Sequence, residues 1–232
     1  MISFMAFSVN AQTTGYYQKL DRKYKKYFVG IGYGLGTASW FSNLGSTQLY
    51  NNSGGVIRSG DMRFRAQNST RLLNMEISAP VSKVRIGLGI SFEDFYLDKL
   101  TLSSNTPGAD GKEIVFDDSF RFEKFYAQIE APFKFETDKP YSFGFKGNVG
   151  YYGYSGGSHF NFFGDSQLAR TFFVNLGLMG DYKLFPHAYF FINPSFEYKY
   201  FRNSQTEAPS EIIHNIISFS AVAGLRFDVS RE

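Results

Sequence analysis

The feature that most constrains this chain is a strict alternation of apolar residues with small or polar ones. In the clearest stretch, the odd positions from Tyr27 to Leu35 are aromatic or aliphatic, and the even positions from Gly30 to Gly36 are all glycine. A period of two over this length predicts a β-strand whose two faces have opposite chemistry. The chain is therefore expected to be all-β, and its function depends on which face points inward.

The alternation recurs in eight stretches, and the connections between them are alternately short and long. The predicted strands cover residues 27–40, 71–81, 84–97, 120–135, 141–154, 167–183, 188–201 and 213–227. Short turns on one side and long loops on the other are typical of transmembrane barrels. An even number of strands returns both chain ends to the same side.

The residue pattern also predicts the register of two hairpins. A turn at residues 82–83 places Ile77 opposite Leu88 on the apolar face. A turn centred on residue 138 places Glu130 opposite Lys146 on the polar face. Such cross-strand pairs stabilise a sheet, so one register satisfies both faces of each hairpin.

The alternation changes phase at two places. Phe64 is out of phase with Leu73, so the strand is expected either to bulge or to end near residues 67–69. Phe122 is out of phase with Phe125 in the same way. Both alternatives stay open.

The distribution of side chains between the faces favours a membrane barrel over a soluble one with an apolar core. Mean hydropathy is only −0.24, and no run of about eighteen apolar residues predicts a membrane helix. Glycines lie on the polar face, where a narrow lumen needs small residues. Aromatic residues near the strand ends form two expected girdles on the apolar face. The lower girdle is Tyr27, Phe135, Tyr141, Tyr182 and Phe227, and the upper is Trp40, Phe92, Tyr151, Tyr198 and Tyr200.

The charged residues within the strands fall mainly on the polar face. Facing lipid at the midplane, a lysine or arginine costs about 2–4 kcal/mol, whereas inside a barrel it can pair. We therefore expect a closed eight-stranded antiparallel transmembrane β-barrel, apolar outside, with a polar interior network that plugs the lumen; a conducting solute channel is the alternative. The expected network is Glu76, Arg85, Glu93, Glu130, Lys146, Asp181, Glu197, Lys199 and Arg226.

Several segments carry a resemblance to a known family. They are the glycine-rich opening strand, Glu76 to Pro80 and Glu130 to Pro132 before short turns, and the closing run Phe219 to Phe227. Together they resemble the small eight-stranded outer-membrane barrels of the OmpA/OmpX type. The resemblance implies a location in the outer membrane of a Gram-negative bacterium.

The chain ends suggest four segments. Residues 1–11 are expected to be a truncated signal peptide and residues 12–26 a basic periplasmic lead-in. The barrel is expected over residues 27–227, and residues 228–232 are a short periplasmic tail.

Catalytic and metal-binding patterns are weak. The chain has no cysteine, and its three histidines, His159, His187 and His214, stand in no spacing that pairs a nucleophile with a base. We expect no enzyme activity, no metal and no cofactor, with a lipid-modifying enzyme as the alternative.

Specificity is expected to reside in the long loops. The segment 41–70 combines apolar residues with arginines and is either a partner-binding patch or an extended strand above the membrane. The patch residues are Tyr50, Arg58, Arg63, Phe64 and Arg65. The expected partners are outer-membrane lipid and lipopolysaccharide, and an envelope protein bound through the loops or the basic N-terminal segment. The basic residues form no stripe of the kind that binds nucleic acid, and the net charge is only +3. Nucleic acid is therefore not an expected partner. The expected role is structural, adhesive or that of an accessory subunit, as a monomer or within a complex.

Overall fold

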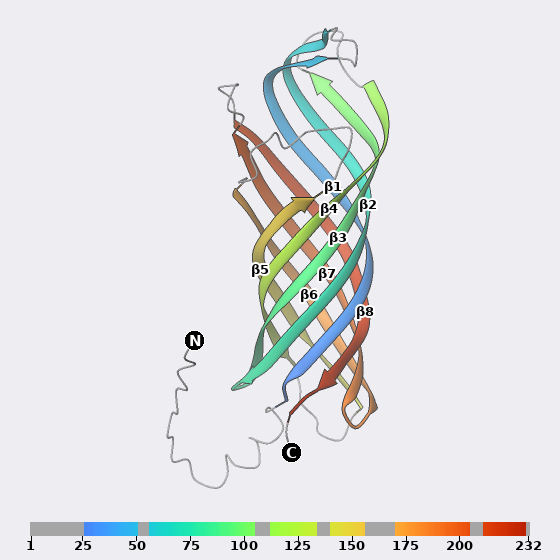
Figure 1. Ribbon diagram of the computed structural model, residues 1–232, viewed down its shortest axis with the longest axis vertical. Helices are drawn as coiled ribbons and strands as arrows, with labels where there is room; N and C mark the ends of the chain where they lie inside the picture. Colours follow the sequence, from blue (N-terminus) through green and yellow to red (C-terminus); the bar gives the residue numbers. More distant parts are fainter. Residues whose placement is uncertain are drawn as a thin grey trace.

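The structure, a computed structural model, describes residues 26–50, 56–104, 112–133, 140–155, 170–204 and 211–230. Eight antiparallel strands close into one barrel in chain order, with β1 paired to β8 (Figure 1). The strands are β1 Phe28–Tyr50, β2 Val56–Val81, β3 Val84–Ser104, β4 Lys112–Pro132, β5 Tyr141–Ser155, β6 Arg170–Phe185, β7 Ala188–Ser204 and β8 Glu211–Asp228. The expected fold class is confirmed.

The predicted hairpin registers are also confirmed. Ile77 lies opposite Leu88 across the β2–β3 turn, where Ser82 adopts the left-handed conformation (φ 56°) that tight hairpin turns require. Glu130 lies opposite Lys146 between β4 and β5. The turn that joins β2 to β3 marks the lower end of the barrel, where β1 begins and β8 ends (Figure 1).

Strands β1 to β4 are longer than predicted. Within the segment 41–70, the residues on both sides of 51–55 are strand. The pairing of β1 with β2 begins at Phe28 opposite Ser78 and continues to Tyr50 opposite Val56. These strands rise above the others at the upper end (Figure 1). The alternation fades in this region because both faces carry polar residues once the strand leaves the apolar band, so the pattern no longer identifies a strand.

The phase changes have a different cause from the one expected. Strand β4 passes residues 123–124 without a register shift, and Phe122 points into the lumen with no exposed surface. From Ala66 to Ser78, where the side chains of β2 are described, the even positions face inward, including the buried Leu72. The apolar residues change face because the upper lumen is lined by apolar side chains. One bulge does occur at this height, where Asp98 is an extra residue in β3.

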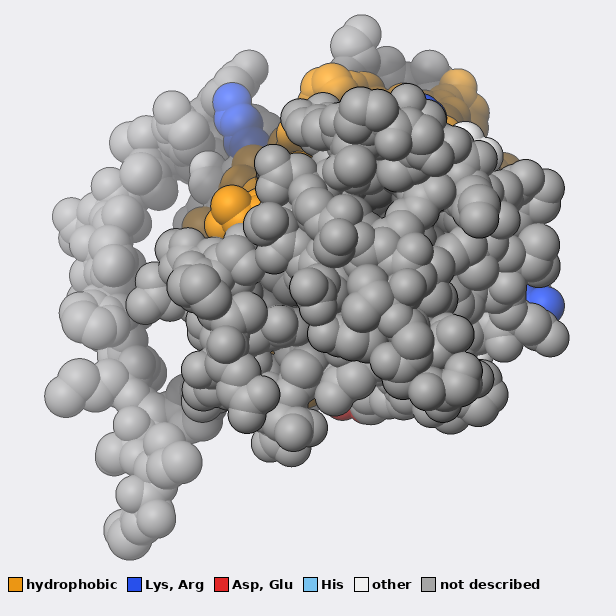
Figure 2. Space-filling view, turned by 90° about the horizontal axis from the view of Figure 1, so that it is seen from above, with side chains coloured by type: hydrophobic (Ala, Val, Ile, Leu, Met, Phe, Trp, Pro, Cys, Tyr) orange, Lys and Arg blue, Asp and Glu red, His pale blue; other side chains and the backbone are white. Residues whose placement is uncertain are grey.

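The outer surface of the barrel is apolar. Ile31, Leu88, Phe143 and Leu225, which would meet in the core of a soluble barrel, are 47%, 61%, 58% and 39% exposed. Seen from above, the hydrophobic side chains that are described come into view at the margin of the molecule (Figure 2). Glu130 and Lys146 are buried inside. This arrangement is the one that a lipid environment stabilises.

No helix within the described residues has the length and apolar character to cross a membrane.

Inside the barrel, glycine makes room for large side chains. A methyl group on Gly32 would come within 2.7 Å of the ring of Phe191, which packs across the lumen from β7. The glycine face of β1 thus leaves the space that inward-facing side chains of the other strands fill.

The orientation predicts how charge is tolerated on the outer surface. Leu88→Lys, in the middle of the apolar band of β3, should lower the free energy of unfolding in lipid vesicles by about 2–4 kcal/mol. The matched variant Phe185→Lys, at the exposed lower end of β6, should cost about 0–1 kcal/mol. If denaturant titrations give the same loss in free energy of unfolding for both variants, the placement of Leu88 in the middle of the bilayer is wrong.

Candidate functional site: the filled lumen

The lower half of the lumen holds a cluster of paired charges, here called the lower ionic cluster. It consists of Glu76, Arg85, Glu130, Lys146, Asp181 and Arg226. Arg226 contacts three carboxylates, at 3.3 Å from Glu76, 3.2 Å from Glu130 and 3.3 Å from Asp181. The three cations balance the three carboxylates, so burial leaves no net charge in the cluster.

Glu130 is the carboxylate with the most cationic partners in this cluster. Its side chain has no exposed surface and accepts from Arg85 at 2.7 Å and from two guanidinium nitrogens of Arg226 at 3.2 Å. Lys146 lies 3.8 Å away and makes a closer ion pair with Glu76. Glu130 and Lys146 therefore act within a network that joins β2, β3, β4, β5, β6 and β8, rather than as one cross-strand pair.

A second charge cluster, the upper ionic cluster, lies higher in the lumen. It consists of Glu93, Lys124, Glu197 and Lys199. Each lysine contacts both carboxylates at 2.6–2.9 Å, and Lys199 also donates to Ser218 at 2.8 Å. Two cations again balance two carboxylates.

Polar side chains fill most of the space between the two clusters. Asn175 donates to Ser195 at 3.0 Å, and Ser195 lies 3.3 Å from Ser220. The cavity that remains there measures 20 Å³, which holds about one water molecule. Asn74 and Tyr126 are among the residues that line it. A solute larger than water does not fit this cavity without movement of the side chains that line it.

At and above the level of the upper ionic cluster, aromatic rings cross the lumen in an aromatic layer of Trp40, Phe95, Phe122, Tyr152 and Phe173. Neighbouring rings meet mainly edge to face, with centroids 5.3–6.5 Å apart. The ammonium groups of Lys124 and Lys199 lie 5.4 Å and 5.6 Å from the centroids of Phe173 and Phe95. The interior is therefore polar as expected through the two ionic clusters, and the aromatic layer is an addition that the residue pattern did not predict.

The placement of Trp40 in the upper outward girdle is wrong. Trp40 has no exposed surface, because its position on β1 has the parity of the inward-facing glycines. Tyr151, by contrast, is 73% exposed on the outer face. The hydropathy pattern alone assigned Trp40 to the apolar face, and strand parity places it in the lumen.

His214 and Ser42 form a contact beside Trp40 that the sequence pattern did not indicate. The indole N–H of Trp40 donates to Ser42 Oγ at 3.0 Å and to His214 Nδ1 at 3.2 Å, and Ser42 Oγ also contacts His214 Nδ1. Since His214 Nδ1 accepts from the indole, its proton resides on Nε2. The contact joins β1 to β8 inside the lumen, where both side chains are buried.

At the lower end, rings cover the ionic cluster. The guanidinium carbon of Arg85 lies 4.8 Å from the centroid of Phe28, and that of Arg226 lies 5.2 Å from Phe191. Outside this cover, Lys26 donates to the Tyr189 hydroxyl at 2.7 Å and pairs with Asp228 at 3.2 Å. Partial burial opposes the charge on Lys26, but these two partners outweigh it and raise the pKa of Lys26.

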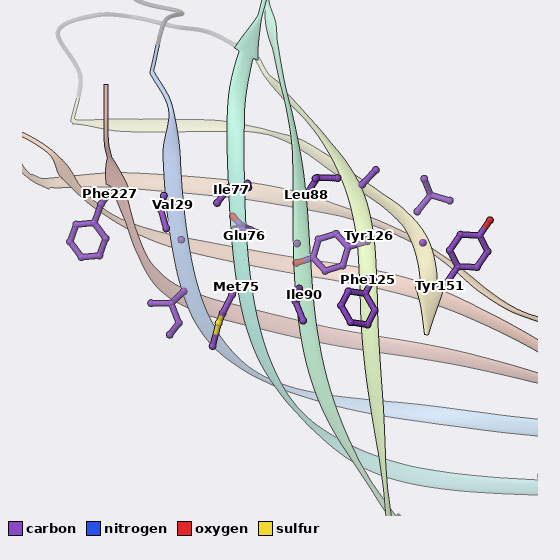
Figure 3. A pocket seen from close by; sticks show the side chains of 16 residues that line it. Val29, Met75, Glu76, Ile77, Leu88, Ile90, Phe125, Tyr126, Tyr151 and Phe227 are labelled. Atoms are coloured by element: carbon purple, nitrogen blue, oxygen red, sulfur yellow. The ribbon is translucent and has the colours of Figure 1, made fainter. Parts of the chain in front are cut away.

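The outer wall carries an apolar groove of 840 Å³ across β1 to β5. Figure 3 shows its side chains, which run from Val29 on β1 to Tyr151 on β5. The groove is hollow because Ala127 lies between the larger Leu88 and Val149 on adjacent strands. Acyl chains of the bilayer are its natural filling, since the groove lies within the exposed apolar band.

The structure places all nine expected interior residues in the lumen, divided between the two ionic clusters. Lys124 completes the upper cluster and was missed because a break in the strand was expected beside it. It has the same parity as Tyr126 and Glu130, which is the signal that identifies it.

The expected loop patch is only partly within the described structure. Tyr50, Arg58, Arg63 and Phe64 lie on paired strands β1 and β2, and their side chains are outside the described residues. Arg65 is exposed, with its guanidinium carbon 5.5 Å from the centroid of Phe41. His159 lies outside the described residues, and His187 lies in the lower turn between β6 and β7.

Because the charges of the lower ionic cluster balance, the effects of two substitutions within it on the free energy of unfolding should not be additive. Glu130→Gln should lower the free energy of unfolding by about 3–5 kcal/mol, because it leaves buried cations without a carboxylate. Adding Arg85→Met restores the neutrality of the cluster. The free energy of unfolding of the double variant should therefore fall by about 0.5–3 kcal/mol less than the sum of the losses in the two single variants.

Arg121→Gln is the matched control for this cycle. Arg121 pairs with Asp94 at 2.7 Å on the exposed outer face, and its loss should cost about 0–1 kcal/mol. Additive costs for Glu130→Gln and Arg85→Met in urea titrations would contradict the network.

The comparisons with known proteins show the fold of this chain and assign it to no family. No protein-family model matches the sequence, and no curated protein matches it significantly. The outer membrane protein OprG of Pseudomonas aeruginosa has a TM-score of 0.50 at 9% identity, covering 89% of this chain and 97% of that one. The outer membrane protease OmpT of Escherichia coli has a TM-score of 0.44 at 10% identity, covering 88% and 96%. Together with the exposed apolar band, the likeness to OprG shows that this chain has the fold of an outer-membrane β-barrel.

Proposed function

We propose that this protein is a closed, non-conducting barrel of the bacterial outer membrane that presents the tall wall of β1 to β4 to a partner outside the cell. A transmembrane strand needs about 9–11 residues to cross the bilayer. Strand β2 has 26 residues and β1 has 23, whereas β5 has 15. More than half of β2 is therefore available outside the apolar band.

The filled lumen supports a binding role over transport. Two neutral ionic clusters, the polar layer between them and the aromatic layer occupy successive levels of the interior. Opening a path would separate buried ion pairs, which costs several kcal/mol for each unpaired charge. The observation that carries the proposal is this contrast between an occupied interior and a wall far longer than the membrane requires.

The position of His214 weighs against the alternative of a lipid-modifying enzyme. Its ring is buried in the lumen beside Trp40, whereas a lipid substrate approaches from the outer face. The contact with Ser42 fits a structural link between β1 and β8.

The filled lumen predicts that the protein conducts no ions across a bilayer. Purified protein reconstituted in planar bilayers should give no discrete conductance steps, because the cavity between the clusters accommodates about one water molecule. A general porin reconstituted in parallel verifies insertion. Regular steps whose size changes in Lys199→Gln would support the channel alternative.

The tall wall predicts where a partner binds. Replacing residues 46–61 by a two-residue Asn-Gly turn removes the tip of the β1–β2 hairpin, and it should abolish co-purification of a stoichiometric companion from gently solubilised outer membranes. The barrel should still fold, because the shortened strands still exceed the length that crosses the membrane.

The matched control shortens the neighbouring hairpin of the barrel, since β8 pairs with β1 on the side away from β2. Replacing residues 203–212 by the same turn trims the β7–β8 hairpin and should leave the companion in place. Retention of the companion by both variants, or its loss from both, would contradict recognition through the β1–β2 wall.

A further inference from the structure

The outer wall holds an amphipathic groove of 550 Å³ at the seam between β1 and β8, here called the seam groove. Thr37 lies opposite Phe219, and Ser39 lies opposite Ile217, across this seam. On its other side β1 pairs with β2, where Gln67 faces Ser39. The groove forms because the short side chains of Thr37 and Ser39 lie between longer neighbours.

The two sides of the seam groove have opposite chemistry. Its apolar side consists of Phe196, Ile217 and Phe219, which are 49%, 39% and 60% exposed. Its polar side consists of Thr37, Ser39, Gln67 and Ser69, on the outward faces of β1 and β2. Polar groups facing hydrocarbon would remain without partners, so this side lies at the level of lipid headgroups.

Two arginines flank the polar side. Arg65, Gln67, Ser69 and Arg71 follow one another at every second position of β2 and share its outward face. Arg71 is exposed and lies over the ring of Tyr96, with its guanidinium carbon 4.9 Å from the centroid; Arg65 lies over Phe41 in the same way. Stacking fixes the plane of a guanidinium and leaves its N–H edge available to a phosphate.

We propose that the seam groove binds one phosphate-bearing glycolipid of the outer leaflet. An acyl chain lies along Phe219 and its apolar neighbours. Sugar hydroxyl or amide groups hydrogen-bond to Thr37 and Gln67. The phosphates are held by Arg65 and Arg71, because guanidinium groups bind phosphate through paired, charge-assisted hydrogen bonds.

The site is separate from the hairpin tip on which the proposed function rests. Its ligand belongs to the membrane, and its residues lie below the segment removed in the trimming experiment. Failure of either proposal therefore leaves the other in place.

The test is native mass spectrometry of the full chain in detergent, titrated with diphosphorylated lipid A. The unaltered protein should retain one lipid A molecule, and Arg65→Gln and Arg71→Gln should each weaken retention at least about tenfold. Arg121→Gln is the matched control, since that outward arginine is paired with Asp94 and lies on β4, two strands away from the strands that line the groove. Because Asp94 also lies opposite Arg71, the double variant Arg121→Gln/Asp94→Asn is measured beside it. Circular dichroism verifies that each variant folds.

Three further comparisons separate the sources of binding. Lipid A without its phosphates should bind at least about tenfold more weakly. Phe219→Ala should weaken retention, whereas Phe143→Ala, an outward phenylalanine of similar exposure elsewhere on the barrel, should not. Inorganic phosphate at millimolar concentration should not displace the lipid.

The proposal is overturned if Arg121→Gln weakens retention as much as Arg71→Gln does, because binding is then unspecific attraction of charge. It is also overturned if lipid A without phosphates binds equally well, or if inorganic phosphate displaces the lipid. In the last case the arginines form a simple anion site.

Discussion

The constraint on which this structure depends is charge neutrality inside a narrow cylinder. Eight strands leave an interior just wide enough for side chains, and a charge sealed there is stable only beside its counter-charge. Arg226 and Glu130 meet this constraint at the centre of the lower cluster, where contacts converge from several strands. These contacts link strands that are not neighbours in the sheet, so the interior braces the wall.

An occupied interior directs the proposed binding role to the outside of the barrel. The extra length of β1 to β4 places backbone-paired strands, rather than irregular loops, above the membrane on one side. Strands hold side chains more rigidly than loops do, because each residue is fixed by its ladder of hydrogen bonds. The same wall presents Arg65 and Arg71 on its outward face, at two heights.

The sequence predicted the parts of the structure in which hydropathy and parity agree. Ile77 opposite Leu88 and Glu130 opposite Lys146 follow from alternation across short turns, where one register satisfies both faces. The upper lumen was not predictable in this way, because Phe122 is apolar and still points inward. Its place depends on rings contributed by other strands. The partner of Glu130 on β8 was equally hidden, since the closure of the barrel brings Arg226 to it. Arg85, by contrast, lies directly opposite Glu130 on the adjacent strand β3.

The ion pair between Lys26 and Asp228 joins a residue two positions before the first strand to the last residue of the final strand. Both ends of the barrel segment therefore lie on one side of the bilayer, and the ion pair ties them together where β1 and β8 meet. The hydroxyl of Tyr189 on β7 accepts from the same ammonium group, so the residues that lead into β1 are held by both β7 and β8.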